Sequence, residues 1–385
     1  MPMDRPGKRM ADREMNMLRN NRREFLCGIA GLAMLTSTSA FAQAVPEGYP
    51  ADYAAVIAAA NKEGKVVVYT STDLSQVKQL SAAFKARYPG IELEFNDLGT
   101  TGTYNRVISE AAAGQTSADL SWTNAMDQQI KLVSDGLAQA YKSPEAAKLP
   151  EWAVYKDTAY GTTIEPLTLG YNTVLLKKED VPKTRADLTK YINDNADSLK
   201  GKVATFDPEK AGSGFLFHTY DLKHLGDSFW DLAKAFGKVE GKLYTSTGQL
   251  KEKLVSGEHV LVFNLIGSYA LDWVKTSPTL GVAFTEDYTE TFSRPLFITK
   301  EAPHPNAARV FLDFVLSRDG QRAVAEGGLP AIRDDVGDGV LSIKQLNEMA
   351  HGNLRPIHVD ETLLEYQQPQ KRAEFLRTWN TAIGR

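Results

Sequence analysis

The sequence predicts an α/β fold made of two lobes joined by a hinge of two crossing strands. Strand-like apolar runs alternate with amphipathic helical segments along most of the chain, which is typical of a mostly parallel sheet covered by helices. About 340 residues follow an N-terminal segment with the layout of an export signal, and that length suggests two domains rather than one core. A long extended stretch at 160–176, GTTIEPLTLGYNTVLL in its main part, interrupts the alternation and suits a strand that crosses between lobes.

The N-terminal stretch NRREFLCGIAGLAMLTSTSAFAQA, residues 21–44, is interpreted as containing a cleavable export signal rather than as part of the folded protein. A basic region precedes an apolar run at 25–35, too short for the roughly 20 residues that span a bilayer, and small residues follow. The order Asn-Arg-Arg-Glu-Phe-Leu at 21–26 resembles a twin-arginine signal, with an ordinary secretory signal as the alternative. We expect residues 1–42 to be removed by cleavage between Ala42 and Gln43, and the product to reside in the periplasm.

Removal of this segment changes the charge of the chain. Residues 1–42 carry seven Lys and Arg and four Asp and Glu, so the totals of 44 and 48 fall to 37 basic and 44 acidic residues, a net charge of −7. A mildly acidic chain is not expected to bind nucleic acid. The single cysteine, Cys27, lies in the removed segment, so we expect no disulfide and no thiolate metal site. We also expect no cofactor and a monomer.

The elements of the first lobe follow in order along the chain. The run KVVVYTST is continuously apolar at its centre, as in a parallel strand buried on both faces. The helix after it has Leu74, Val77, Leu80 and Phe84 spaced for one face. The predicted strands are 65–72, 91–97 and 119–123, and the predicted helices are 74–87, 104–113 and 126–134.

The second lobe is predicted to begin after the crossing strand. Its expected strands are 202–206, 259–264 and 281–285, and its expected helices are 215–225, 229–236, 250–256 and 269–275. Helices at 307–316 and 319–326 then close the chain in the first lobe. The predicted division is therefore an export signal at 1–42, the first lobe at 43–165, the second lobe at 166–284, and the return with the C-terminal helices at 285–385.

Small and hydroxyl-bearing residues follow several of the predicted strands, where helices begin. Ligands of open α/β sheets bind beyond the carboxyl ends of the strands, and helix starts there offer unpaired N–H groups to an anion. Helix capping alone is the better explanation of any single such loop, but five such loops around one predicted cleft favour a ligand site. The ligand-binding residues that we expect in a cleft between the lobes are Thr70, Ser71, Thr101, Trp122, Asn124, Ser213, Gly214, Ser268 and Tyr269.

The sequence shows no catalytic or metal-binding motif. Its histidines lack metal-ligand spacing, and it contains no nucleophile elbow, phosphate-binding loop or dinucleotide fingerprint. We therefore expect a binding protein rather than an enzyme. A periplasmic hydrolase or lyase is the alternative, with Glu165 or His218 as the first candidates for acid–base chemistry. Arg106 and Arg294 are either anion partners or members of structural ion pairs.

Four segments carry a resemblance to a known family: KVVVYTSTDLSQVKQLSAAFKARYPGIELEF, ADLSWTNAMD, LTLGYNTVLL and HPNAARVFLDFVLSRDGQRAVAEGGLPAIRDDV. In this order and spacing they resemble the periplasmic solute-binding proteins of ABC importers, in the group that includes ferric-ion, sugar-phosphate and aminoethylphosphonate binders. The resemblance implies the type II two-lobe fold, with the second lobe inserted in the first. It also implies capture of a solute and its delivery to an inner-membrane permease.

One departure from the family bears on the ligand. Ferric-ion members carry two adjacent tyrosines at a helix start in the second lobe, whereas this chain has Ile-Gly-Ser-Tyr-Ala at 266–270, with Tyr269 alone. We therefore predict a small organic anion, namely a phosphonate, a phosphate ester or a carboxylate. Ferric ion is the alternative ligand.

Overall fold

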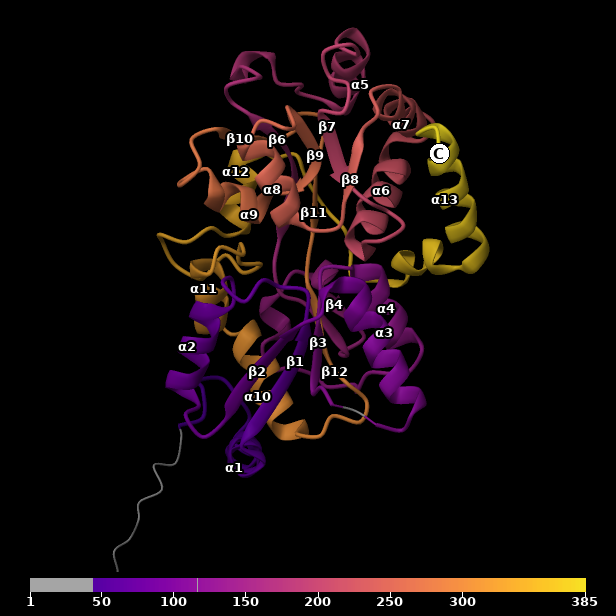
Figure 1. Ribbon diagram of the computed structural model, residues 1–385. Helices are drawn as coiled ribbons and strands as arrows, with labels where there is room; N and C mark the ends of the chain where they lie inside the picture. Colours follow the sequence, from indigo (N-terminus) through magenta and orange to yellow (C-terminus); the bar gives the residue numbers. More distant parts are fainter. Residues whose placement is uncertain (1–43, 116) are drawn as a thin grey trace, which may run out of the picture. The chain divides into compact units, whose positions relative to one another are not determined.

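The computed structural model describes residues 44–115 and 117–385. The expected export signal and its cleavage point after Ala42 lie outside these residues. Two sheets organise the described part of the chain, one with six strands and one with seven (Figure 1). We call the six-stranded sheet and its helices lobe 1, and the seven-stranded sheet and its helices lobe 2.

Lobe 1 holds the first three strands in parallel. Its strand order is β2-β1-β3-β12-β5-β4, in which β12 runs antiparallel to both β3 and β5. The strands are β1 (Lys65–Thr70), β2 (Glu92–Asp97), β3 (Leu120–Trp122), β4 (Val154–Tyr155), β5 (Ala159–Gly161) and β12 (Pro295–Ile298). The helices are α1 (Tyr53–Glu63), α2 (Lys78–Arg87), α3 (Gly99–Ala112), α4 (Met126–Ser134), α10 (Pro305–Leu316) and α11 (Arg318–Glu326), with short 3₁₀ turns η1 (Ala146–Lys148) and η2 (Glu151–Ala153).

Lobe 2 is built around β6, which pairs with β9, β10 and β11. Its order is β13-β11-β6-β9-β7-β8, and β10 pairs with β6 off this path. The strands are β6 (Glu165–Asn172), β7 (Val203–Phe206), β8 (Lys242–Tyr244), β9 (Leu261–Ile266), β10 (Leu280–Ala283), β11 (Thr289–Phe292) and β13 (Leu354–Pro356). The helices are α5 (Arg185–Asp194), α6 (Gly212–Leu225), α7 (Ser228–Lys238), α8 (Thr247–Val255), α9 (Gly267–Trp273), α12 (Ile343–Met349) and α13 (Pro369–Ala382), with η3 (Lys178–Asp180) and η4 (Glu361–Gln367).

The predicted α/β fold of two lobes is confirmed, with local differences. Strand β1 is buried along Val66, Val67 and Val68, as its apolar run predicted. Helix α2 begins at Lys78 instead of Leu74, because Asp73 to Gln76 form a turn closed by a backbone hydrogen bond of 2.9 Å. Leu74 is 56% exposed and therefore does not belong to the apolar face assigned to it.

The lobes are connected at three places within the described residues, whereas the sequence predicted two crossings. The chain leaves lobe 1 between β5 and β6, returns between β11 and β12, and crosses again after α11 to reach β13. The first return differs from the predicted boundary at 285, because β11 pairs with β6 and keeps Thr289–Phe292 in lobe 2. Residues Ser293 and Arg294 thus form the returning connection.

The C-terminal end also differs from the predicted division. Strand β13 pairs with β11, and α13 lies beside α7, so both belong to lobe 2 (Figure 1). Phe375 and Trp379 of α13 are buried against Phe229, with ring centroids 6.1 and 6.0 Å apart. Aromatic side chains of this size contribute a large share of core burial. Helix α13 is therefore part of the hydrophobic core of lobe 2.

Candidate functional site

A cavity of about 280 Å³ lies where the two lobes meet. Residues at the carboxyl ends of six strands line it: β1, β2 and β3 in lobe 1, and β7, β8 and β9 in lobe 2. This is the edge of an α/β sheet at which ligands bind. The lining residues are Ser71, Asp73, Asp97, Gly99, Thr100, Asn124, Phe206, Ser213, Thr245, Ser246, Thr247, Gly248, Ile266 and Tyr269.

Three helices of nine or more residues begin at this cavity. Gly99 and Thr100 open α3, Ser213 lies in the first turn of α6, and Thr247 and Gly248 open α8. The first N–H groups of a helix have no partner within it, and the helix dipole places partial positive charge at the same end. The cavity therefore presents hydrogen-bond donors from both lobes.

Three nearly buried side chains add donors to the cavity. Ser213 is 5% exposed, and its hydroxyl has no hydrogen-bond partner among the described residues. Asn124 is also 5% exposed; its Oδ1 accepts a hydrogen bond of 3.1 Å from Ser71 Oγ, which leaves the amide hydrogens of Asn124 for a ligand. Tyr269 is 4% exposed. Buried polar groups normally find partners, so these donors indicate a binding site.

Tyr269 is held by a buried guanidinium. Arg294 Nη2 donates to the Tyr269 hydroxyl over 3.3 Å, and the Arg294 guanidinium carbon lies 5.5 Å from the ring centroid. Because this phenol oxygen accepts from Arg294, its own proton is available to another acceptor. Burial raises the pKa of Tyr269 to about 12, although Arg294 opposes the rise. The phenol is thus neutral at physiological pH.

Arg294 is itself neutralised by a carboxylate at the start of β6. Its Nε and Nη2 lie 2.6 and 3.0 Å from Glu165 Oε1 and Oε2, and both side chains are fully buried. Arg294 Nη1 also donates to Thr72 Oγ1 of lobe 1 over 3.0 Å. The ion pair therefore ties the first two connections between the lobes to the loop after β1 and, through Tyr269, to α9.

The lobes also touch beside the cavity. The Gly212 backbone N–H of lobe 2 donates to Thr100 Oγ1 of lobe 1 over 3.2 Å. Thr101 Oγ1 donates to the Lys210 carbonyl, at a longer 3.5 Å. The starts of α3 and α6 are thus in direct contact.

Comparison with protein families identifies this architecture. Residues 79–350 match the model for a bacterial extracellular solute-binding protein. This chain belongs to that family. The family resemblance predicted from the sequence is confirmed, and so is the two-lobe fold.

Solved structures agree with this assignment. A substrate-binding protein of an ABC transporter from Agrobacterium tumefaciens is 33% identical, with a TM-score of 0.78 over 83% of this chain and 94% of the other. AfuA from Actinobacillus pleuropneumoniae, with fructose-6-phosphate bound, is 21% identical, with a TM-score of 0.68 over 83% and 99%. Iron-bound HitA from Pseudomonas aeruginosa is 18% identical, with a TM-score of 0.66 over the same shares. A sequence comparison with curated proteins gives no match.

Four of the nine predicted ligand-binding residues line the cavity of this solute-binding protein: Ser71, Asn124, Ser213 and Tyr269. The structure places the other five around or behind the lining. Thr70 Oγ1 donates to the Trp122 carbonyl, and Trp122 is fully buried with its Nε1 donating to Thr162. Thr101 contacts Lys210 beside the cavity. Gly214 packs against Asp207, and Ser268 Oγ donates to Glu165.

Three of these five positions have a physical reason that the structure shows. Trp122 points into the aromatic core of lobe 1, where its ring lies 6.1 Å from Phe95, because the odd and even positions of β3 face opposite sides of the sheet. Gly214 allows close approach of α6 to β7, since a Cβ there would lie 2.7 Å from the Asp207 carbonyl oxygen. Ser268 supports the buried Glu165 rather than a ligand, through a hydrogen bond of 2.6 Å.

The residues that an enzymatic alternative would use do not line the cavity. Glu165 is paired with Arg294. His218 is fully buried, with Nε2 3.0 Å from the Phe206 carbonyl oxygen and its ring 4.5 Å from that of Trp379. Arg106, one of the two candidate anion partners, pairs with Glu110 on the surface of α3.

Two aspartates in the lining were not predicted as ligand contacts. Asp73 lies in the loop after β1, and Asp97 is the last residue of β2. Burial raises the pKa of the Asp73 carboxyl; Arg294 opposes this rise and Asp97 adds to it. The only sequence signal for them is an acidic residue at the end of each of two adjacent parallel strands.

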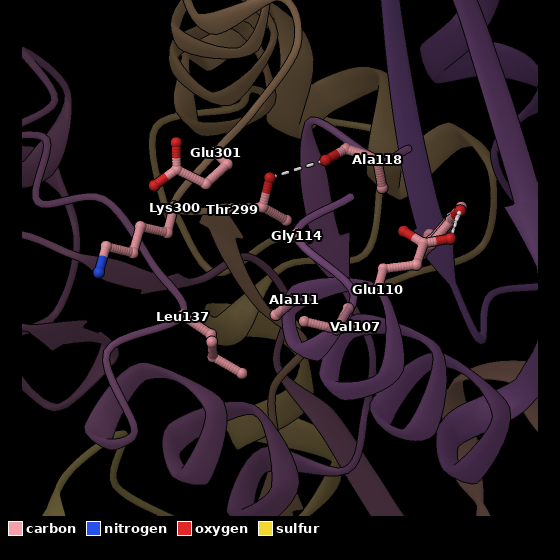
Figure 2. Close-up of a pocket in the computed structure, with 10 residues that line it drawn as sticks. Val107, Glu110, Ala111, Gly114, Ala118, Leu137, Thr299, Lys300 and Glu301 are labelled. Atoms are coloured by element: carbon pink, nitrogen blue, oxygen red, sulfur yellow. Dashed lines mark hydrogen bonds between the residues drawn. The ribbon is translucent and has the colours of Figure 1, made fainter. Parts of the chain in front are cut away.

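A larger cavity, about 540 Å³, lies within lobe 1 (Figure 2). Its lining includes Val107, Glu110, Leu137 and Lys300, all from the lobe 1 sheet and helices or the loops between them. The Glu110 carboxylate already accepts from Tyr69 and from the Ser117 backbone N–H, over 2.9 and 3.0 Å. A ligand here would contact one lobe only and could not favour closure of the two.

Residues 44–115 and 117–385 lack two kinds of feature. No cluster of three or more His, Cys, Asp or Glu suited to a metal ion occurs among them. None of their helices is both long enough and apolar enough to cross a membrane.

Proposed function

We propose that this chain is the solute-binding component of an ABC importer and that it captures a small organic anion in the cavity between its lobes. The protein acts in the periplasm as a monomer, after export on a twin-arginine signal, and hands its ligand to an inner-membrane permease. The 33% identity to the Agrobacterium tumefaciens protein, over most of both chains, supports the transport role. The likeness to AfuA shows the same fold around a phosphorylated ligand.

The observation that carries the ligand class is the donor set of the cavity. Ser213, Asn124 and Tyr269 each offer a hydrogen that no described residue accepts, and α3, α6 and α8 start around them. An anionic oxygen satisfies such donors, and hydrogen bonds to charged groups are roughly twice as strong as neutral ones. Phosphonate, phosphate ester and carboxylate groups share this chemistry.

Binding and lobe closure are coupled in this proposal. Asn124 belongs to lobe 1, whereas Ser213 and Tyr269 belong to lobe 2, so a ligand completes its contacts only when both lobes surround it. A ligand shifts a conformational equilibrium by its difference in affinity for the two states. The closed form then presents the loaded protein to the permease.

Ferric ion is less well supported as the ligand. Iron-binding sites use ionised phenolate oxygen, but burial raises the pKa of the single cavity tyrosine, Tyr269, to about 12. Its oxygen also accepts a hydrogen bond from Arg294. Turnover of the ligand is not expected either, because Glu165 and His218 are engaged away from the cavity lining.

The test is a thermal-shift screen of residues 43–385 against phosphonates, sugar phosphates, carboxylates and ferric citrate, followed by calorimetry. An anion at 100 times its Kd should stabilise the protein by about 2.7 kcal/mol. Ser213→Ala and Asn124→Ala should each weaken binding by about 10-fold or more, through loss of a hydrogen bond to a charged group. Ser109→Ala is the control, because Ser109 is exposed on α3 and bonds to its own helix.

The result against the proposal is equally specific. Stabilisation by ferric ion alone, abolished by Tyr269→Phe, would reject an organic anion. Mass spectrometry of the incubated ligand would reveal any turnover and so reject a pure binding role.

A further inference from the structure

We propose that the ligand carries a positively charged amine in addition to its anionic group, and that Asp73 and Asp97 select for this amine. The inference rests on the proposed function and names the substrate class of the same cavity. The ligand would therefore be a compact zwitterion, such as an amino acid or an aminophosphonate.

The first argument is the charge of the lining. Asp73 and Asp97 contribute two carboxylates, while none of the described residues that line this cavity is a lysine, arginine or histidine. Arg294 offsets part of the charge of Asp73, but Glu165 accepts from two of its three guanidinium nitrogens and balances its charge, so the two lining aspartates have no cation of their own. An anion without a cationic group would thus meet uncompensated negative charge.

The second argument is that neither aspartate is committed to a cation. No ion pair of Asp73 or Asp97 occurs within the described part of the chain, although many of its other surface carboxylates form one. Asp97 Oδ1 accepts only from the Gly99 backbone N–H, over 3.1 Å. Repulsion from Asp97 contributes to the raised pKa of the Asp73 carboxyl. An ammonium placed between them would remove this repulsion and donate to both.

A third and independent observation marks the opposite end of the cavity. Ser213 and Thr247 of lobe 2 are 5% and 7% exposed, and neither hydroxyl has a hydrogen-bond partner among the described residues. Both stand in the first turns of helices, α6 and α8, whose starts favour negative charge. Lobe 1 thus supplies the acidic end and lobe 2 supplies donors for an anion.

These two ends define the orientation and size of the ligand. The amine faces the loops after β1 and β2, and the anionic group faces the starts of α6 and α8. The cavity volume of about 280 Å³ restricts the ligand to a compact molecule. Sugar hydroxyls could also donate to the aspartates, so a sugar phosphate is the competing ligand that the experiment must separate.

The experiment uses calorimetry on residues 43–385 with matched probes. The pairs are 2-aminoethylphosphonate with ethylphosphonate and 3-aminopropanoate with propanoate; fructose 6-phosphate represents hydroxyl-rich anions. At least one amine-bearing probe should bind about 10- to 100-fold more tightly than its amine-free partner, the range expected for a hydrogen-bonded charge pair. In the double variant Asp73→Asn with Asp97→Asn this preference should disappear, because the amine-bearing probe should bind more weakly while the affinity of its amine-free partner should not fall.

Controls keep the result interpretable. The asparagine at 97 retains an oxygen for the Gly99 N–H, and both aspartates are exposed at the cavity, so the variant should fold as the wild type does by circular dichroism. Asp135→Asn makes the same kind of substitution in lobe 1, with loss of one carboxylate, at a residue paired with Lys131 outside the cavity, and it should leave the preference intact.

Three outcomes overturn the inference. Equal or tighter binding of the amine-free probes refutes it and leaves the proposed function standing. The inference is also refuted if fructose 6-phosphate binds tightly and binds more weakly to the double variant, while neither amine-bearing probe binds. If none of the anions binds, with or without an amine, both the inference and the proposed ligand class fall.

Discussion

Removal of Arg294 alone should destabilise the protein strongly. Arg294→Met keeps an unbranched apolar chain but leaves the Glu165 carboxylate fully buried, with only the hydroxyls of Thr163 and Ser268 as donors. Breaking a buried ion pair on one side costs about 3–5 kcal/mol. The lost hydrogen bond to Thr72 adds about 1 kcal/mol, so we expect a loss of roughly 4–6 kcal/mol in the free energy of unfolding.

The assay is urea unfolding of residues 43–385, followed by far-ultraviolet circular dichroism and tryptophan fluorescence. The variants are Arg294→Met, Glu165→Gln and the double variant. The double variant should lose less than the sum of the two, by at least about 2 kcal/mol, since neither position 165 nor position 294 then carries a charge. Arg106→Met is the matched control; it breaks the surface pair with Glu110 and should cost less than about 1 kcal/mol.

A loss below about 1 kcal/mol for Arg294→Met would refute this reasoning, and so would additive losses in the double variant. Either result would mean that water or another group compensates Glu165 in solution, and that the pair does not bind the connecting strands together.

Two further predictions concern the packing of individual elements. Asp127, fully buried and bonded to Gln367 of η4, has its pKa raised from 3.8 to about 6 by burial. The stability that its protonated form provides is therefore present below about pH 4 and is lost as the pH rises through 6. In urea unfolding, Asp127→Asn should be more stable than the wild type by up to about 3 kcal/mol at pH 8, and this difference should narrow by about 1 kcal/mol by pH 5. A stability difference that does not vary with pH would contradict this prediction. Gly320→Ala should lower the free energy of unfolding by about 1–3 kcal/mol or more, because its Cβ would lie 1.7 Å from the Phe314 backbone oxygen. Gly248→Ala is the control: its Cβ would meet open space, so the free energy of unfolding should change by less than about 1 kcal/mol.

Part of the site could be predicted from the chain because parallel strands bring their carboxyl ends to one edge. Ser71 and Asn124 come directly after strands of lobe 1, and Ser213 lies in the first turn of a helix in lobe 2, so sequence order alone indicates where they meet. Trp122 and Ser268 share the same local pattern but not the same role. Side chains at a strand end face the cavity or the core in alternation, so a shift of one residue reverses the role of each. The sequence pattern did not fix this alternation.

The division of the lobes was less predictable than their existence. Strand β11 and helix α13 have no local signal of which lobe they join, because that choice depends on pairing with β6 and on packing against α7. Contacts between residues far apart in the chain decided both.

The sequence by itself determined the strand–helix alternation, the two-lobe architecture, the family and the polar loops at the strand ends, because these follow from local patterns of burial and capping. Only the tertiary structure decided the charge of the cavity. Glu165 lies far from Arg294 in the chain but adjacent to it in space, so the guanidinium is neutralised, while Asp73 and Asp97 face the cavity without a cation. The charge that a ligand meets depends on which ionised groups pair in three dimensions, and no spacing along the chain specifies those pairs.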